Sequence, residues 1–162
     1  MVFYEEAVHV PLLMRMPAAM KAGTVVQDPV SGLDLFATIL DYLGVPAPRR
    51  DGDSLRPLIE GRGKAGLDYR VSEWNARALP NFMVRTADWK LMIADSPQSR
   101  AMDALYDLRN DPYEMRNLLG DPADRSRYAA KAGEMKDRLI EWLQWVGNPA
   151  LEGVKQRKFT VS

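Results

Sequence analysis

The 162-residue chain carries 22 basic and 22 acidic side chains, so its formal charges cancel, and 46% of its residues are hydrophobic. This length and composition predict one domain, or one domain with an appendage, and exclude a disordered chain. With no basic block, the charge balance argues against nucleic acid or an anionic membrane as partner. The lack of cysteine excludes disulfides, thiolate zinc sites and cysteine nucleophiles.

Targeting segments give no further information. Residues 1–20 lack the basic lead and long apolar stretch of a signal peptide. No apolar run approaches the ~18 residues that a membrane span requires. The cellular location therefore stays open.

The first predicted element is a strand over residues 10–16. This run, VPLLMRM, is nearly continuous in apolar residues and is closed by Pro17. Such runs are typical of strands buried between neighbours on both sides. The few residues before it cannot supply such a neighbour, so the sequence raises the question of what covers it.

A helix is predicted over residues 31–44. Ser31 is a suitable N-cap, and Asp34 places negative charge in the first turn. Gly44 followed by Pro46 ends the helix. Its apolar residues recur on one face: Leu33, Phe36, Leu40 and Leu43.

The sequence pattern changes in the middle of the chain, from helical spacing to loops and short strands. Residues 46–66 are rich in proline and glycine and contain one predicted helical turn around residues 55–59. Four short β-rich segments follow, which predict an antiparallel meander with one solvent-facing side and a hairpin around Ala87-Asp88. The predicted strands are residues 69–74, 82–86, 89–93 and 104–108.

The last predicted element is an amphipathic helix of roughly 25 residues. Asp121 can cap it, Pro122 suits its first position, and Gly147 ends it. We expect this helix to lie across the sheet and the tail from Ala150 to be frayed. The predicted fold class is therefore α+β, a short antiparallel sheet of about four strands packed against a long C-terminal helix.

Residue chemistry alone reveals no complete catalytic constellation. His9 is the single histidine, so it cannot form a metal site unaided. Residues 107–114 gather oxygen ligands but lack the glycine and the spacing of a calcium loop, which favours a turn at Asn110-Asp111-Pro112. Ser54 and Ser72 have no histidine nearby in sequence, so a hydrolytic triad is unsupported.

Three residues near the end of the predicted strand at residues 69–74 could line a binding cleft. Trp74 offers a flat apolar surface, while Asn75 and Arg77 offer hydrogen-bond donors. The alternative is a tryptophan that anchors the edge of the sheet. His9 joins Trp74, Asn75 and Arg77 as a candidate for substrate contact.

The order of five segments resembles the C-terminal part of a sulfatase. The family shows a Tyr-Glu stretch ending in Val-Pro, a helix with an Asp-Leu-x-x-Thr core, a DGxSLxP loop, a hairpin with Arg-Thr-x-x-aromatic-Lys and an LYDLxxDPxExxNL segment. The matching segments here are residues 4–13, 30–46, 51–58, 84–91 and 105–118. Two positions depart from the family pattern: His9 stands where arginine is common, and Ala37 where proline is frequent.

The resemblance implies a formylglycine-dependent sulfuric ester hydrolase of the alkaline-phosphatase-like superfamily. Residues 1–60 would be the tail of the large α/β catalytic domain, a strand-helix remnant, and residues 61–162 the C-terminal subdomain. The formylglycine motif, the calcium ligands and a sulfate-binding lysine just before Met1 would all lie upstream. We therefore expect no metal ligand, no catalytic residue and no activity in this chain alone, whose role would be structural and as one wall of the substrate cleft.

Two other functions stay open. The chain could be a stand-alone interaction module, or the C-terminal part of a related phosphonate or phosphate monoester hydrolase. In each case the apolar run at residues 10–14 and the apolar helix face need a cover. We expect a homodimer or higher oligomer, by exchange of the N-terminal segment, or a complex with an N-terminal sulfatase half.

Overall fold

The computed structural model describes residues 3–16, 20–46, 52–63, 66–76 and 79–159. Its contacts divide the chain into two compact units. The sheet unit comprises Met1–Val10 with Val71–Ser162, and the helix unit comprises Pro11–Arg70. Within the described ranges, no helix has the length and apolar character needed to cross a membrane. The assignment of residues 1–60 to a larger catalytic domain stays a prediction.

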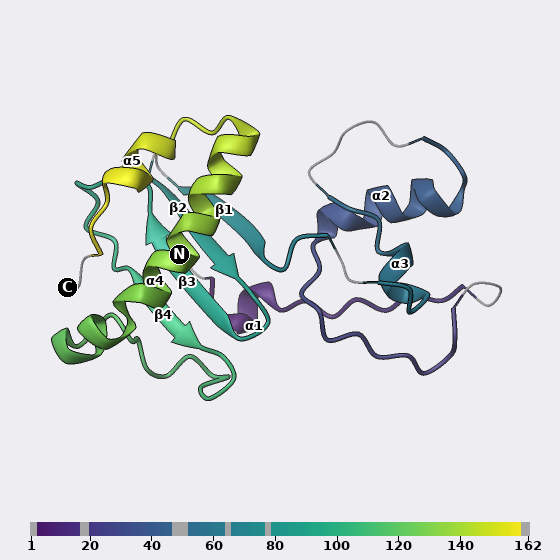
Figure 1. Ribbon diagram of the computed structural model, residues 1–162, viewed down its shortest axis with the longest axis horizontal. Coiled ribbons are helices and arrows are strands. Elements are labelled where there is room, and N and C mark those ends of the chain that lie inside the picture. The colour runs from purple at the N-terminus through teal and green to yellow at the C-terminus, as the bar shows by residue number, and fades with distance from the viewer. Residues whose placement is uncertain (1–2, 17–19, 47–51, 64–65, 77–78, 160–162) are drawn as a thin grey trace. The chain divides into compact units, whose positions relative to one another are not determined.

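The sheet unit contains the predicted antiparallel sheet, in the order β1-β2-β3-β4 (Figure 1). The four strands are β1 (Arg70–Ala76), β2 (Leu79–Arg85), β3 (Trp89–Ala94) and β4 (Ala104–Asp107). The hairpin around Ala87-Asp88 is confirmed, because β2 and β3 pair antiparallel with Val84 opposite Leu91. This arrangement confirms the α+β fold class.

The prediction that every strand has one solvent-facing side is wrong for β3. Its residues 90–94 are all buried, because both faces of the sheet are covered. On one face, Phe3 packs into a cluster with Met83, Met92 and Tyr106. Side chains alternate along a strand, so Leu91 points to the opposite face, on which α4 lies (Figure 1). The N-terminal segment, including α1 (Glu5–Val8), is therefore a third layer over the sheet.

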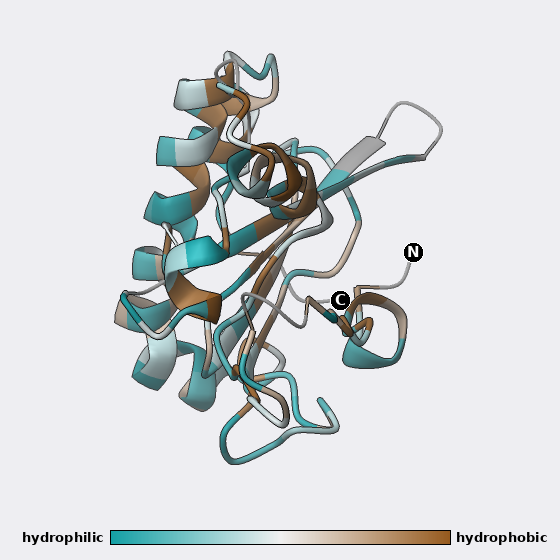
Figure 2. Ribbon diagram, turned by 90° about the vertical axis from the view of Figure 1, so that its right-hand side faces the viewer, coloured by the Kyte–Doolittle hydropathy of each residue, from teal (hydrophilic) through white to brown (hydrophobic). Residues whose placement is uncertain are grey.

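Helix α4 (Pro122–Val146) confirms the predicted 25-residue helix across the sheet. The Asp121 side chain accepts the N–H groups of Ala123 and Asp124, and Gly147 ends the helix in a left-handed conformation with φ 68°. Its hydrophilic residues lie on the side away from the sheet (Figure 2). The residues that it buries recur at three- and four-residue spacing: Ala132, Met135, Leu139 and Leu143.

The tail after residue 150 is ordered, so the prediction of a frayed end is wrong. It forms α5 (Leu151–Gln156) and ends on Arg157, which is 2% exposed. A Cβ atom at Gly153 would stand 2.1 Å from the carbonyl oxygen of Asp95, so only glycine lets the two backbones approach this closely. The contacts that hold the tail are long-range, and local sequence patterns do not reveal them.

The helix unit contains α2 (Gly32–Tyr42) and the short α3 (Arg56–Ile59). The predicted cap is confirmed as a capping box. The Ser31 side chain accepts the Leu33 N–H, and the Asp34 side chain accepts the Ser31 N–H. Residues 10–16 form no strand, contrary to prediction. A strand needs a ladder partner, and this run pairs with no strand among the described residues, leaving Leu13 95% exposed.

Candidate functional site

The four candidate substrate-contact residues do not form one cluster among the described residues. His9 follows α1, and its side chain is 71% exposed with Nδ1 at 3.3 Å from Glu5 Oε2. Trp74, 55% exposed, and Asn75 lie on β1. Arg77 lies outside the described residues. No described interaction joins His9 to Trp74 or Asn75, so their role in a cleft stays a prediction.

The acidic segment after β4 is a turn, as the sequence favoured, and its oxygens are used within it. The Asp111 carboxylate accepts the backbone N–H groups of Met115 at 3.0 Å and Arg116 at 2.9 Å. Asn110 donates to Asp107 at 2.8 Å. Across the described ranges, no group of three or more His, Asp or Glu side chains could hold a metal ion. These residues therefore do not fit the calcium site that the family resemblance implies for a complete enzyme.

A buried charge cluster joins the N-terminal segment to the sheet, and sequence reasoning missed it. The cluster consists of Glu5, Arg85, Lys90 and Glu114. The Lys90 side chain is fully buried, and its Nζ lies 2.6 Å from Glu5 Oε1 and 2.8 Å from Glu114 Oε1. It also donates to the Phe3 carbonyl oxygen at 2.8 Å. The contact with Glu114 Oε1 is an ion pair without hydrogen-bond geometry, whereas the contact with Phe3 is a hydrogen bond.

Glu5 is held through both its side chain and its backbone. Arg85 donates to the two Glu5 carboxylate oxygens at 3.0 Å each, in a bidentate pair. The Glu5 backbone N–H donates to Glu114 Oε2 at 2.6 Å. Burial alone would raise the pKa of Glu5, but hydrogen bonds from Arg85 and Lys90 outweigh it and lower that pKa to about 2. The carboxylate is therefore ionised at neutral pH.

The neighbouring aromatic residues extend this contact. Tyr4 packs on Tyr106 with ring centroids 6.1 Å apart. Burial, together with a hydrogen bond to Tyr4, raises the pKa of Tyr106. A lysine on a strand normally suggests a solvent-facing position, and Lys90 meets Phe3 across 87 residues of sequence. Local patterns could not have signalled a contact at that separation.

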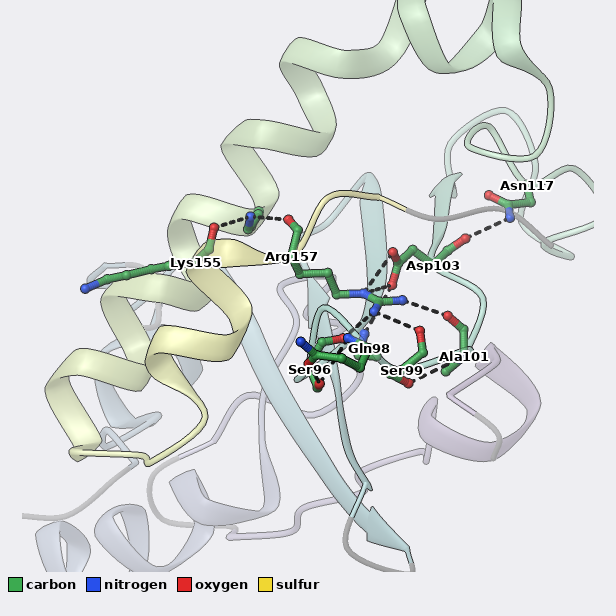
Figure 3. Close-up of polar contacts among 10 residues, drawn as sticks. Ser96, Gln98, Ser99, Ala101, Asp103, Asn117, Lys155 and Arg157 are labelled. Atoms are coloured by element: carbon green, nitrogen blue, oxygen red, sulfur yellow. Dashed lines mark hydrogen bonds and ion pairs between the residues drawn. The ribbon is translucent and has the colours of Figure 1, made fainter.

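A second buried network surrounds Arg157 at the C-terminal end (Figure 3). Its Nε donates to both carboxylate oxygens of Asp103, at 2.8 and 3.0 Å. The remaining donors reach the carbonyl oxygens of Ser96, Ser99 and Ala101. One side chain therefore holds the whole connection between β3 and β4, and both charged partners are fully buried.

In the helix unit, α2 buries polar residues and exposes apolar ones. Thr38 accepts the N–H of Leu55 at 2.8 Å, and Asp34 accepts the N–H of Asp53 at 3.0 Å, so the polar side binds the loop before α3. The opposite side is exposed: Leu33 by 54%, Ile39 by 55%, Leu43 by 69% and Phe36 by 48%. A helix normally buries its apolar face, so this surface needs a cover.

Comparison with known proteins identifies the family. Residues 1–144 match the family described as N-sulphoglucosamine sulphohydrolase, C-terminal. The chain belongs to the sulfatase family. Within it, the matched residues correspond to the C-terminal portion, as the sequence resemblance predicted.

Curated relatives of this sulfatase C-terminal domain are much longer than it is. An N-acetylglucosamine-6-O-sulfatase from Bacteroides thetaiotaomicron is 33% identical over 147 residues, which cover 85% of this chain and 25% of the relative. Human arylsulfatase K is 37% identical over 129 residues, which cover 73% of this chain and 24% of the relative. The chain thus spans about a quarter of the length of these proteins.

Solved structures agree with this assignment. A protein solved in complex with its substrate D-glucosamine-2-N,6-O-disulfate is 29% identical, with a TM-score of 0.65, over 85% of this chain and 29% of that one. The phosphonate monoester hydrolase of Agrobacterium radiobacter is 27% identical, with a TM-score of 0.54, over 67% of this chain and 23% of that one. Both support a hydrolase domain of the alkaline-phosphatase-like fold.

Proposed function

We propose that this domain is the C-terminal part of a sulfuric ester hydrolase that acts on sulfated amino sugars. The observation that carries the substrate class is a chemistry shared by the family description, one relative and one solved structure. The family description, the Bacteroides relative and the substrate-bound structure all name a sulfated or acylated glucosamine. Sulfate-ester and N-sulfate groups on a glucosamine are therefore the bonds to test first.

The domain would contribute structure and one wall of the substrate cleft rather than the reacting groups. The sequence has no cysteine and no Ser-x-Pro-x-Arg motif from which formylglycine could form. The described acidic side chains gather no metal site. We therefore propose that residues 1–162 alone hydrolyse nothing. His9, Trp74, Asn75 and Arg77 remain the candidates for substrate contact.

We propose further that the exposed side of α2 is covered by the larger portion that precedes this domain in its relatives. Leu33, Ile39 and Leu43 supply an apolar surface of the kind that single soluble domains rarely expose. The matched residues make up only 25% and 24% of these relatives, so the relatives contain further polypeptide that can cover it. Without that portion, a second copy of the chain is the expected substitute.

The reaction can be tested with a chimera. Residues 1–162 would replace the matching C-terminal quarter of the Bacteroides N-acetylglucosamine-6-O-sulfatase, and sulfate release from N-acetylglucosamine 6-sulfate would be measured. We expect the chimera to be active and the 162-residue chain alone to be inactive. Activity of the chain alone, or a folded chimera without activity, would overturn the proposal.

The cover of α2 is tested by size-exclusion chromatography with light scattering. We expect the 162-residue chain to self-associate, and Ile39→Glu with Leu43→Glu to make it monomeric. The same pair of substitutions should abolish folding of the chimera. A wild-type chain that is monomeric at high concentration, with α2 intact by circular dichroism, would contradict this part.

A second candidate function is hydrolysis of a phosphonate or phosphate monoester. The observation that favours it is the 27% identity to the Agrobacterium phosphonate monoester hydrolase. The two candidates are separated by assaying the chimera on the phenyl monoester of a phosphonic acid beside the sulfated sugar. This C-terminal domain would support phosphonate turnover only if its contacts shape the cleft for that substrate.

A further inference from the structure

We infer that the sheet unit carries a specific anchor site for the Phe3-Tyr4-Glu5 segment, formed by Arg85, Lys90 and Glu114. The anchor would fix the register of the polypeptide that enters the domain. This inference goes beyond the proposed reaction and does not depend on the substrate. It rests on the contacts of the buried charge cluster and on the backbone conformation of Glu114.

The charges of the cluster are costly to bury. Lys90 and Glu114 have side chains that are 0% and 1% exposed, and removing charges from water is expensive unless each is paired. Apolar residues in their place could stabilise the sheet equally well, so stability does not explain them. Lys90 and Glu114 pair with each other. Their further contacts, to the Phe3 carbonyl and to Glu5, form only when the segment occupies one position, so what the cluster adds is specificity.

The second argument is the geometry of recognition. The site contacts the segment at three points: the Phe3 carbonyl, the Glu5 N–H and the Glu5 carboxylate. Backbone contacts fix the path of the chain, and the bidentate Arg85 pair selects a carboxylate side chain. A slip by one residue would place Tyr4 or Glu6 opposite Arg85 and move Phe3 out of its apolar cluster. Glu6 is exposed in the observed register.

The third argument is backbone strain at Glu114. Its φ is 54°, which makes it the one non-glycine residue with positive φ among the described residues. This conformation costs free energy for a residue with a side chain and persists only where neighbours enforce it. The turn around Asp111 enforces it here. Glycine would suit the turn better, so the strained glutamate is explained by its carboxylate, which reaches Lys90 and the Glu5 N–H.

The anchor has a consequence for a complete enzyme if this domain is part of a sulfuric ester hydrolase, as proposed above. In a sulfatase whose larger portion precedes this domain, the anchor would hold the connecting polypeptide against the sheet. Arg85, Lys90 and Glu114 would then act as positioning residues for that connection. They are separate from His9, Trp74 and Asn75, the candidates for substrate contact.

The decisive variant is Glu114→Gly, measured by hydrogen–deuterium exchange of the whole 162-residue chain with mass spectrometry. Glycine removes the carboxylate and relieves the positive φ. If Glu114 served only its turn, this variant would leave exchange unchanged or slower. The anchor predicts the opposite for residues 3–10, an increase in exchange of at least tenfold that exceeds any increase in β2, β3 and α4.

A matched pair of variants keeps the test independent of the turn. Glu5→Gln removes the recognised charge from the segment itself, and Glu6→Gln makes the same change one residue along on an exposed side chain. We expect faster exchange of residues 3–10 in Glu5→Gln only. The inference is overturned if the two variants behave alike, if Glu114→Gly leaves the segment protected, or if exchange rises equally throughout the sheet unit. Because no activity is measured, these outcomes are distinct from failure of the proposed reaction.

Discussion

Loss of the Arg157 guanidinium should be among the most damaging single changes in the sheet unit. Arg157→Met keeps most of the buried aliphatic stem but leaves the Asp103 carboxylate without its charged partner. Removing one member of a buried pair typically costs about 3–5 kcal/mol. Asp103 still accepts the Ala94 N–H at 3.2 Å, which compensates little of its charge. We therefore expect a loss of about 4 kcal/mol in the free energy of unfolding.

The assay is urea unfolding followed by tryptophan fluorescence. All four tryptophans lie in the sheet unit, so the signal reports that unit and not the helix unit. With a urea dependence of about 2 kcal/mol per molar, the midpoint should fall by about 2 M. A double variant, Arg157→Met with Asp103→Leu, should recover at least half of the loss because no charge is left buried.

The control is Lys155→Met, two residues before Arg157 in the sequence. It removes the cation of an exposed ion pair with Glu152. Surface pairs are worth about 0–1 kcal/mol, so its midpoint should hardly change. If Arg157→Met shifted the midpoint no more than Lys155→Met does, the buried network would not stabilise the domain and the reasoning would be refuted.

Three further results are expected. The pKa of Glu5 is lowered to about 2, so the ionised carboxylate contributes roughly 3 kcal/mol to the free energy of unfolding above pH 4.5, and this contribution is lost as the pH falls toward 2. The difference in urea midpoint between wild type and Glu5→Gln should therefore shrink from pH 6 to pH 2.5. A constant difference would contradict this. Gly52→Ala should destabilise the helix unit by about 1–3 kcal/mol, because its Cβ would lie 2.4 Å from the Leu33 backbone, and faster limited proteolysis of the loop would show it. Thr38→Val leaves the buried Leu55 N–H without an acceptor, so a loss of about 1–3 kcal/mol should appear in the same assay, whereas unchanged cleavage would show that the hydroxyl is dispensable.

Elements whose signals are local could be predicted from the sequence. Ser31 with Asp34, and Asp121 with Gly147, mark the ends of α2 and α4, and the structure confirms those caps. The hairpin between β2 and β3 is equally local. The family could be predicted as well, because five short segments appear in a fixed order and each has a distinct pattern.

Features that depend on contacts distant in sequence could not be predicted. The burial of Lys90 has no local signal, because its partners Glu5 and Glu114 lie far from it in the sequence. The tail was predicted to be frayed because the contact that holds it, between Arg157 and Asp103, joins residues 54 positions apart and has no local signal. At residues 10–16 the apolar composition predicted a strand that the structure does not contain, because composition alone cannot supply a ladder partner.

The Arg157 network also shows that the folded domain extends beyond the residues that match the family. The family match stops at residue 144, inside the last turn of α4, which continues to Val146. Beyond that point, the Arg157 guanidinium that organises the β3–β4 connection is still part of the same interior. A version trimmed to the matched residues would keep every family motif and yet leave the Asp103 carboxylate buried without its cation. Similarity in sequence and cooperative folding thus set different boundaries for the same domain.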